Sequence, residues 1–181
     1  RGVADQGHGV PGQSCHGQSC GGRRMRVLVC LARAGGWAPP GTEERWRELG
    51  FLHAPDFATA QAQHDGLCRQ LEAAGAEVLY LPSAEGLSLD AVYTHDPSLA
   101  TAYGLIGLHP GKPNRIPEAQ RHVDFCRRLG IPEFGQIQPP GNTEAGDMVL
   151  LDPTTLLNGQ VYHTHPAGLD QMTPLLPPPG L

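Results

Sequence analysis

The sequence of 181 residues predicts an α/β domain built from a repeated strand–strand–helix–strand unit. Short apolar runs rich in β-branched residues alternate with longer segments in which apolar residues recur at helical spacing. Gly, Pro and Asp residues that favour turns separate these segments. After one full unit the same order of elements begins again about fifty residues later, and such periodicity controls the architecture.

The chain divides into a leader and one domain. Residues 1–24 are rich in Gly, Gln and Ser and carry almost no large apolar side chains, so they cannot repay the entropy of ordering. We expect a disordered leader there and an incomplete α/β domain over residues 25–181. The leader holds Cys15, His16 and Cys20, but no second ligand pair follows at zinc-site spacing, so we expect no metal.

The first elements are a strand, a helix and a strand. Residues 25–31 form an apolar run with the length and Val content of a buried strand. Asp56 can cap a helix over residues 57–71, which Gly75 ends. Residues 77–81 are then expected to form the next strand.

A further strand is expected over residues 91–93, leading into Asp96 and Pro97. Proline restricts the backbone of the residue before it and cannot donate to a sheet, so it ends regular pairing. Asp96 should therefore lie at the end of a strand.

The repeat begins after Asp96. Its first copy is a hairpin over residues 99–109 that turns at Tyr103 and Gly104, a helix over 117–129 with Pro at its start, and a strand over 133–137. The second copy begins in the same order and stops before its closing strand: strands over residues 148–151 and 155–158, and a helix from Ala167.

An acidic residue in a loop precedes each copy of the repeat, Asp96 the first and Glu144 the second. Equivalent loops of a repeat array project on one face, so the two carboxylates could converge. Glycines bracket Glu144 and Asp147 and permit close backbone approach to a ligand. Taken singly, such residues are more often turn formers, and their repeated placement narrows the gap between that interpretation and a polar pocket for a small cation such as a guanidinium.

Composition excludes several classes of function. The net charge is -5, and the 13 Lys and Arg residues are scattered, so no nucleic-acid partner is expected. No apolar run approaches the roughly 20 residues that span a bilayer, and no secretory signal opens the chain, so we expect no membrane partner and a cytoplasmic location. The five cysteines suggest reduced thiols rather than a disulfide framework. We expect no cofactor, and a homo-oligomer is compatible with the sequence.

Three motifs carry a resemblance to a known family. Residues 89–97 (LDAVYTHDP), 109–115 (HPGKPNR) and 144–147 (EAGD) resemble, in order and spacing, motifs of the dimethylarginine dimethylaminohydrolase-like branch of the amidinotransferase and arginine deiminase superfamily. The resemblance extends from Met25 to the C terminus and excludes the leader.

The resemblance implies the five-bladed α/β propeller of that superfamily (the pentein fold). In the family a Cys thiolate attacks the guanidinium carbon and a His moves protons. Carried over by position, Asp96 and Glu144 would hold the guanidinium, while Asp90 and Arg115 would contact the rest of an amino-acid substrate. That division suits the charges, since carboxylates pair with the cation and Arg with a substrate carboxylate.

Two positions depart from the family pattern. His95, which we expect to support the site together with Asp147, stands where these hydrolases commonly place a second acid. His163 replaces an Arg that would bind the substrate carboxylate, and we keep it as a substrate-binding residue. His163 and His165 could also face one metal ion from a strand, but no third ligand is identifiable, so no metal site is predicted.

No catalytic residue is identified in this chain. The family's catalytic His lies beyond the helix that starts near Ala167, its Cys lies close to the family C terminus, and none of the five cysteines matches it. The sequence therefore predicts an N-terminal fragment of a hydrolase of arginine or methylated arginine that works through a Cys-covalent intermediate, inactive alone. The alternatives are a non-catalytic module that binds guanidinium or another cation, and amidinotransferase chemistry.

Overall fold

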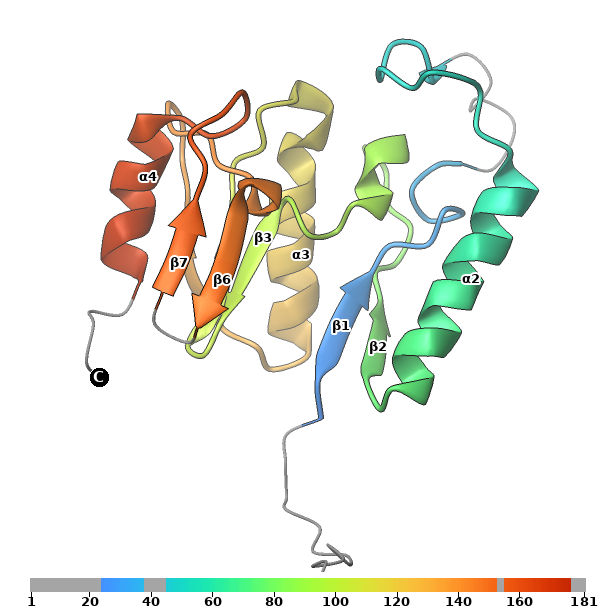
Figure 1. Ribbon diagram of the computed structural model, residues 1–181, viewed down its shortest axis with the longest axis horizontal. Helices are drawn as coiled ribbons and strands as arrows, with labels where there is room; N and C mark the ends of the chain where they lie inside the picture. The colour runs from blue at the N-terminus through green and yellow to red at the C-terminus, as the bar shows by residue number, and fades with distance from the viewer. Residues whose placement is uncertain (1–23, 38–44, 153–154, 177–181) are drawn as a thin grey trace, which may run out of the picture.

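The computed structural model describes residues 24–37, 45–152 and 155–176 of the chain (Figure 1). The expected leader lies outside these residues except for Arg24, and so do Cys15, His16 and Cys20. The division at residue 25 into leader and domain therefore stays a prediction.

The first structural unit is a strand, a helix and a strand. It comprises β1 (Arg26–Val29), α2 (Phe57–Ala73) and β2 (Glu77–Tyr80), and β1 pairs with β2 in parallel. Asp56 caps α2, because its Oδ1 accepts a hydrogen bond from the backbone N–H of Thr59 at 2.7 Å. The two strands and the capped helix expected here are confirmed.

The expected strand over residues 91–93 is wrong. The chain instead forms a 3₁₀ turn, η1 (Leu89–Val92). The N–H of Tyr93 donates back to the carbonyl of Asp90 at 2.9 Å, and the indole of Trp37 donates to the carbonyl of Leu89 at 2.9 Å. These bonds use backbone groups that would otherwise pair with a neighbouring strand. The short apolar run therefore forms a local turn instead of a strand.

The second unit is a complete strand–strand–helix–strand repeat. It contains β3 (Ser98–Thr101), β4 (Gly104–Gly107), α3 (Ile116–Arg128) and β5 (Glu133–Gln136). Strand β4 lies between the other two strands, antiparallel to β3 and parallel to β5. A short 3₁₀ turn, η2 (Pro113–Arg115), leads into α3. The predicted hairpin, helix and returning strand are confirmed within two residues at each end.

The third unit repeats the opening of the second. A 3₁₀ turn, η3 (Ala145–Asp147), precedes the antiparallel strands β6 (Met148–Asp152) and β7 (Thr155–Asn158). Helix α4 (Pro166–Met172) and the turn η4 (Thr173–Leu175) follow. The start of the second copy is thus confirmed, and the molecule is a mixed α/β structure.

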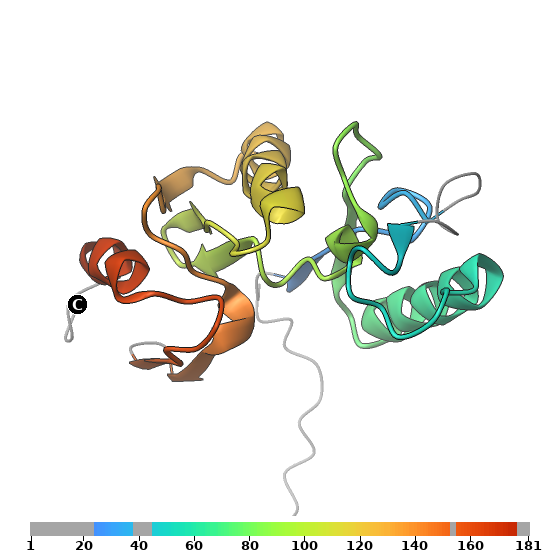
Figure 2. The same cartoon turned by 90° about the horizontal axis from the view of Figure 1, so that it is seen from above.

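The three units lie side by side, as the view from above shows (Figure 2). Phe125 of α3 packs against a buried cluster around Cys30 and Leu81 of the first unit. Ile106 of the second unit and Met148 of the third belong to one buried cluster. Because apolar contacts join each unit to the next, the loops that connect the units are brought together.

Two further expectations bear on the described chain. Cys30, Cys68 and Cys126 are free and buried, as expected for reduced thiols. Among the helices of the described ranges, none is both long and apolar enough to cross a membrane.

Candidate functional site

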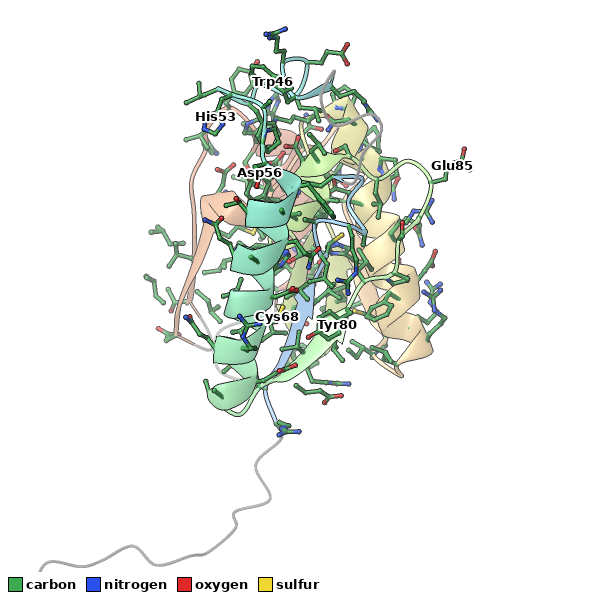
Figure 3. The ribbon with its side chains drawn as sticks, turned by 90° about the vertical axis from the view of Figure 1, so that its right-hand side faces the viewer. Trp46, His53, Asp56, Cys68, Tyr80 and Glu85 are labelled. Atoms are coloured by element: carbon green, nitrogen blue, oxygen red, sulfur yellow. The ribbon has the colours of Figure 1, made fainter. Side chains whose placement is uncertain are left out.

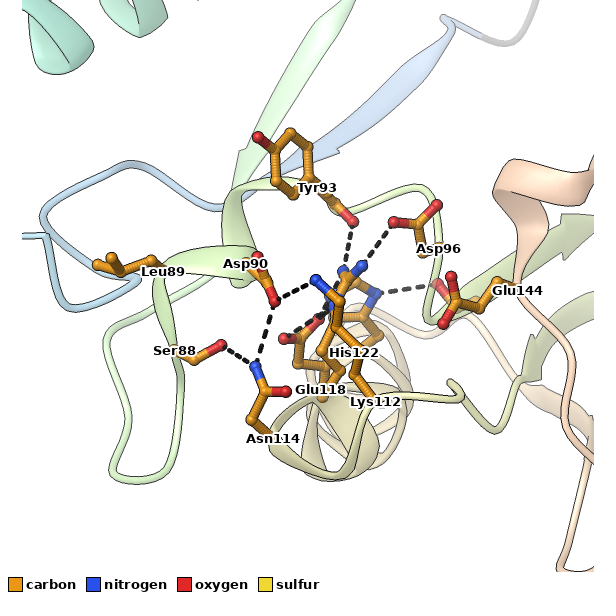
Figure 4. Close-up of polar contacts among 12 residues, drawn as sticks. Ser88, Leu89, Asp90, Tyr93, Asp96, Lys112, Asn114, Glu118, His122 and Glu144 are labelled. Carbon is orange, nitrogen blue, oxygen red and sulfur yellow. Dashed lines mark hydrogen bonds and ion pairs between the residues drawn. The ribbon is translucent and has the colours of Figure 1, made fainter. Parts of the chain in front are cut away.

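Arg115 is buried and binds three groups, and Figure 4 labels the residues that supply them: Tyr93, Asp96 and Glu118. Its Nη1 donates to Oδ2 of Asp96 at 2.6 Å, and its Nη2 donates to the carbonyl of Tyr93 at 2.9 Å. Nε and Nη2 both donate to Oε2 of Glu118, at 3.1 and 2.9 Å. Arg115 stands where η2 meets α3, three residues before Glu118, so one turn of helix brings the two together.

Burial and neighbouring charges shift the pKa values of Arg115 and Glu118. Burial acts to lower the pKa of the Arg115 guanidinium, but the hydrogen bonds and charges of Glu118 and Asp96 outweigh it and raise that pKa. Burial raises the pKa of Glu118, and the carboxylates of Asp90 and Asp96 raise it further, while Arg115 opposes the rise. Arg115 therefore stays charged and compensates a concentration of buried acids.

The contact between Arg115 and a substrate stays a prediction, and most donors of Arg115 are used within the chain. A guanidinium has five N–H donors, and only one hydrogen of Nη1 is left by the contacts to Asp96, Glu118 and Tyr93. The residue is 4% exposed. In this position Arg115 holds the carboxylate of Asp96 through Oδ2.

The loops that carry the two predicted guanidinium-binding acids are in contact. The N–H of Ala145 donates to the carbonyl of Asp96 at 3.1 Å. A Cβ atom added to Gly146 would lie 2.6 Å from Oδ1 of Asp96, so the close approach requires glycine. The packing of the second and third units thus brings Asp96 beside the segment that contains Glu144.

Glu144 is held through one of its carboxylate oxygens. Oε1 accepts a hydrogen bond from the N–H of Gly111 at 2.9 Å, and Nδ1 of His163 lies 3.6 Å from the same oxygen. Thr164 links Glu144 to Asp147, because its Oγ1 donates to Oδ2 of Asp147 at 2.6 Å and accepts from the N–H of Glu144 at 3.3 Å. The predicted residues His163 and Asp147 therefore both lie against Glu144 or its backbone.

Asp90 is buried in η1 and holds two partners that sequence reasoning missed. Its Oδ2 accepts from Nζ of Lys112 and from Nδ2 of Asn114, each at 3.2 Å. Asn114 also donates to Oγ of Ser88 at 2.9 Å. The signal was present, since Lys112 and Asn114 belong to the HPGKPNR motif, but that motif was used only to place Arg115.

A pocket of about 750 Å³ adjoins Asp90. Asp90, Tyr93 and Lys112 form one wall, while Asp96, Glu144 and Arg115 are not among its lining residues. His53 and Asp56 also line the pocket, near the N-terminal end of α2, where Figure 3 shows them with Trp46. The rest of the lining is mostly apolar: Trp37, Leu49, Phe51, Leu52, Pro55 and Ala60.

Three other titratable residues differ in exposure, since His95 is exposed whereas His122 and Cys30 are buried. His95 is exposed and hydrogen-bonds with none of the residues in the described ranges. Burial and the charge of Arg115 lower the pKa of His122 to about 4, and Nδ1 of this ring lies 2.9 Å from Oγ of Ser98. Burial raises the pKa of the Cys30 thiol to about 11.

His163 and His165 do not form the strand that would aim both rings at one ion, since His163 lies in a turn and His165 is the N-cap of α4. Within the described parts of the chain, no group of three or more His, Cys, Asp or Glu residues could hold a metal ion.

No protein-family model matches the chain, but one curated relative does. The N(G),N(G)-dimethylarginine dimethylaminohydrolase of Pseudomonas aeruginosa is 30% identical over 130 residues. The match covers 72% of this chain and 50% of that enzyme, so the chain spans half the length of this relative.

Several solved structures are also similar to this chain. A dimethylarginine dimethylaminohydrolase adduct with 4-chloro-2-hydroxymethylpyridine is 25% identical, with a TM-score of 0.67 over 84% of this chain and 56% of that one. A mutant of the P. aeruginosa enzyme in complex with citrulline is 26% identical, with the same TM-score and coverage. The product-bound N-terminal domain of ArgZ, a cyanobacterial arginine dihydrolase, is 17% identical with a TM-score of 0.67, over 84% of this chain and 54% of that one, which shows a shared fold.

Proposed function

Because the chain belongs to the dimethylarginine dimethylaminohydrolase-like branch of the amidinotransferase and arginine deiminase superfamily, we propose that it forms the substrate-holding part of a guanidine-modifying hydrolase. The proposed substrate is arginine or a methylated arginine. In keeping with the family fold, the three units described here would be part of a five-bladed α/β propeller. The activity of a whole protein belongs to the proposal, since the chain spans half of its curated relative.

The hydrogen bonding of the Asp96 and Glu144 carboxylates is the observation that supports the proposal. Asp96 uses Oδ2 to accept from Arg115, and Glu144 uses Oε1 to accept from Gly111. Within the described chain, no residue hydrogen-bonds to Oδ1 of Asp96 or to Oε2 of Glu144. Each acid is thus fixed through one oxygen and retains the other for a planar cation with several N–H donors.

The remaining predicted residues take roles around these acids. Asp90 would meet the amino-acid end of the substrate, while His163 would border Glu144 and the substrate. We assign Arg115 to holding Asp96 in place, because its donors are nearly all used. Asp147 would support Glu144 through Thr164.

The chemistry itself would follow the family. A Cys thiolate would add to the guanidinium carbon, the amine would leave with a proton supplied by a His, and water would release the product and restore the thiol. Cys30, Cys68 and Cys126 are buried, and none is aligned with the family nucleophile. We therefore propose that this chain alone binds guanidines without converting them.

The same burial of cysteines favours a second candidate, a non-catalytic guanidinium-binding module. Both candidates use Asp96 and Glu144, and they differ in whether a whole protein turns the ligand over.

The first experiment is isothermal titration calorimetry of the chain with arginine and dimethylarginine. We expect binding to the parent chain and a loss of about tenfold or more for Asp96→Asn and for Glu144→Gln, which keep the shape but remove the charge. The control is Asp124→Asn on the exposed side of α3, which should bind as the parent does. Binding unchanged in both site variants would overturn the proposed site.

The second experiment is an assay for citrulline, for released amine and for transfer of the amidino group to an acceptor amine. We expect no turnover by this chain. Turnover at rates typical of enzymes, about 1 per second or more, would contradict the proposal that the chain binds without converting.

A further inference from the structure

Lys112 is the only lysine among the 181 residues, and it lies in the wall of the pocket beside Asp90. Its side chain is 42% exposed, whereas that of Asp90 is 4% exposed. Nζ of Lys112 lies 3.2 Å from Oδ2 of Asp90. An ammonium has three donors, so within the described contacts two remain for a ligand.

Two other basic residues near the proposed site are held by contacts within the chain. Arg115 is 4% exposed and is bound to Asp96 and Glu118. Nδ1 of His109 lies 2.7 Å from Oδ1 of Asn142. Lys112 is the only Lys or Arg among the lining residues of the pocket, where the other basic side chain is that of His53.

Hydrogen bonds link lining residues of the pocket to the two acids proposed to bind the guanidinium. Gly111 donates its N–H to Glu144, and the next residue, Lys112, donates its ammonium to Asp90. Arg115 binds Asp96 through Nη1 and the carbonyl of Tyr93, a wall residue of the pocket, through Nη2. In the view of Figure 4, Lys112 lies between Asp90 on one side and Asp96 and Glu144 on the other.

The charges of the wall select among ligands. A lone carboxylate near Lys112 would also meet the negative charge of Asp90, and a lone ammonium near Asp90 would meet the positive charge of Lys112. A zwitterion satisfies both, because its ammonium can pair with Asp90 while its carboxylate pairs with Lys112. Trp37 and Phe51 supply an apolar surface nearby, which strengthens such charge contacts by excluding water.

We propose that Lys112 binds the α-carboxylate of the substrate and thereby selects a free α-amino acid over a decarboxylated guanidine. This inference rests on the proposed function, since it assumes that the guanidinium end lies at Asp96 and Glu144. Asp90 receives the α-ammonium in the same pocket. Lys112 thus binds the substrate carboxylate, the role that the family resemblance suggested for Arg115 and for the position of His163.

Calorimetry of Lys112→Met with three ligands tests the inference. L-Arginine carries both ends, agmatine lacks the carboxylate, and L-norvaline lacks the guanidinium. We expect Lys112→Met to weaken arginine and norvaline about tenfold and to leave agmatine unchanged, while Lys112→Arg keeps most of the affinity for arginine. Equal losses for arginine and agmatine, or no loss for either, would overturn the role of Lys112.

The variant Asp96→Asn separates this inference from the proposed function. It should weaken arginine and agmatine alike and leave norvaline unchanged. If Asp96→Asn changes none of the three while Lys112→Met still discriminates between arginine and agmatine, the proposed guanidinium site fails and the carboxylate site stands.

A second measurement uses the unique lysine in the parent chain and does not depend on any variant. The rate of Lys112 acetylation can be followed by peptide mass spectrometry, which separates it from the N-terminal amine. Saturating arginine and norvaline should slow the reaction about tenfold, and agmatine should not. An acetylation rate that no amino acid alters would overturn the inference, whatever the guanidinium acids do.

Discussion

Nη1 of Arg115 lies 2.6 Å from Oδ2 of Asp96, so an acid proposed to bind a substrate guanidinium is itself held by a guanidinium of the chain. The bond uses one oxygen of Asp96 and directs the other toward Gly146. Because Glu118 anchors the same Arg115 from the opposite side, the carboxylate of Asp96 has little freedom to reorient. A preformed carboxylate lowers the entropy lost when a ligand binds.

Removal of this arginine should destabilise the fold strongly. In Arg115→Met the carboxylates of Glu118 and Asp96 lose their buried cation, and breaking a buried pair on one side costs about 3–5 kcal/mol. Urea denaturation followed by circular dichroism would measure the free energy of unfolding.

Arg127→Met is the matched control. Arg127 also bridges two acids, Asp124 and Glu133, but its side chain is 55% exposed. Solvent screens such pairs, so the expected change is below about 1 kcal/mol. Equal losses in the free energy of unfolding for the two substitutions would show that the buried network around Arg115 stabilises the fold no more than the exposed ion pairs of Arg127 do.

His122 should make stability depend on pH. Burial, together with the charge of Arg115, lowers its pKa from 6.5 to about 4. Between these values the unfolded chain binds a proton that the folded chain excludes, so the free energy of unfolding falls as the pH falls from 6.5 to about 4. The full effect of such a shift is about 3 kcal/mol.

The variant His122→Asn isolates this contribution from those of the carboxylates. Asn can still meet Oγ of Ser98 but does not titrate, so the parent should lose about 3 kcal/mol more than the variant over that pH range. Urea denaturation at several pH values measures both curves, and parallel curves would refute the assignment.

Gly146→Ala should weaken guanidine binding. The new Cβ would lie 2.6 Å from Oδ1 of Asp96, so the carboxylate must move. We expect calorimetry to show a loss of about tenfold for arginine, equivalent to about 1.4 kcal/mol. Gly159→Ala is the control, because its Cβ would meet the carbonyl of Asp147 at an ordinary 3.6 Å. Parent-like arginine binding by Gly146→Ala would contradict the close approach.

The three described cysteines should be unreactive in the folded chain. Cys30, Cys68 and Cys126 are 0%, 4% and 5% exposed, and burial raises the pKa of Cys30 to about 11. Iodoacetamide at about pH 8 should leave their peptides unmodified until urea is added, because the thiolate is the reactive form. Rapid labelling of any of the three in the native chain would show that a nucleophile had been overlooked.

Local sequence accounts for most of the elements. Asp56 caps α2 and Pro117 opens α3, since caps and proline act on their own turn of helix. The recurrence of hairpin and helix after residue 147 was visible because repeats copy their hydrophobic period. The run at 91–93 is too short to show a period, so the sequence did not reveal that it belongs to a 3₁₀ turn. The first residue of that turn, Leu89, accepts a hydrogen bond from distant Trp37.

The sequence by itself determined the order of the units, the two acidic loops and the family motifs, since all of these are patterns along the chain. Only the tertiary structure decided how the charges pair. Arg115 meets Asp96 across 19 positions and Lys112 meets Asp90 across 22, and no local rule selects one acid over another at such separations. The packing of the units sets those distances, and it turned Arg115 toward Asp96 while leaving Lys112 at the pocket.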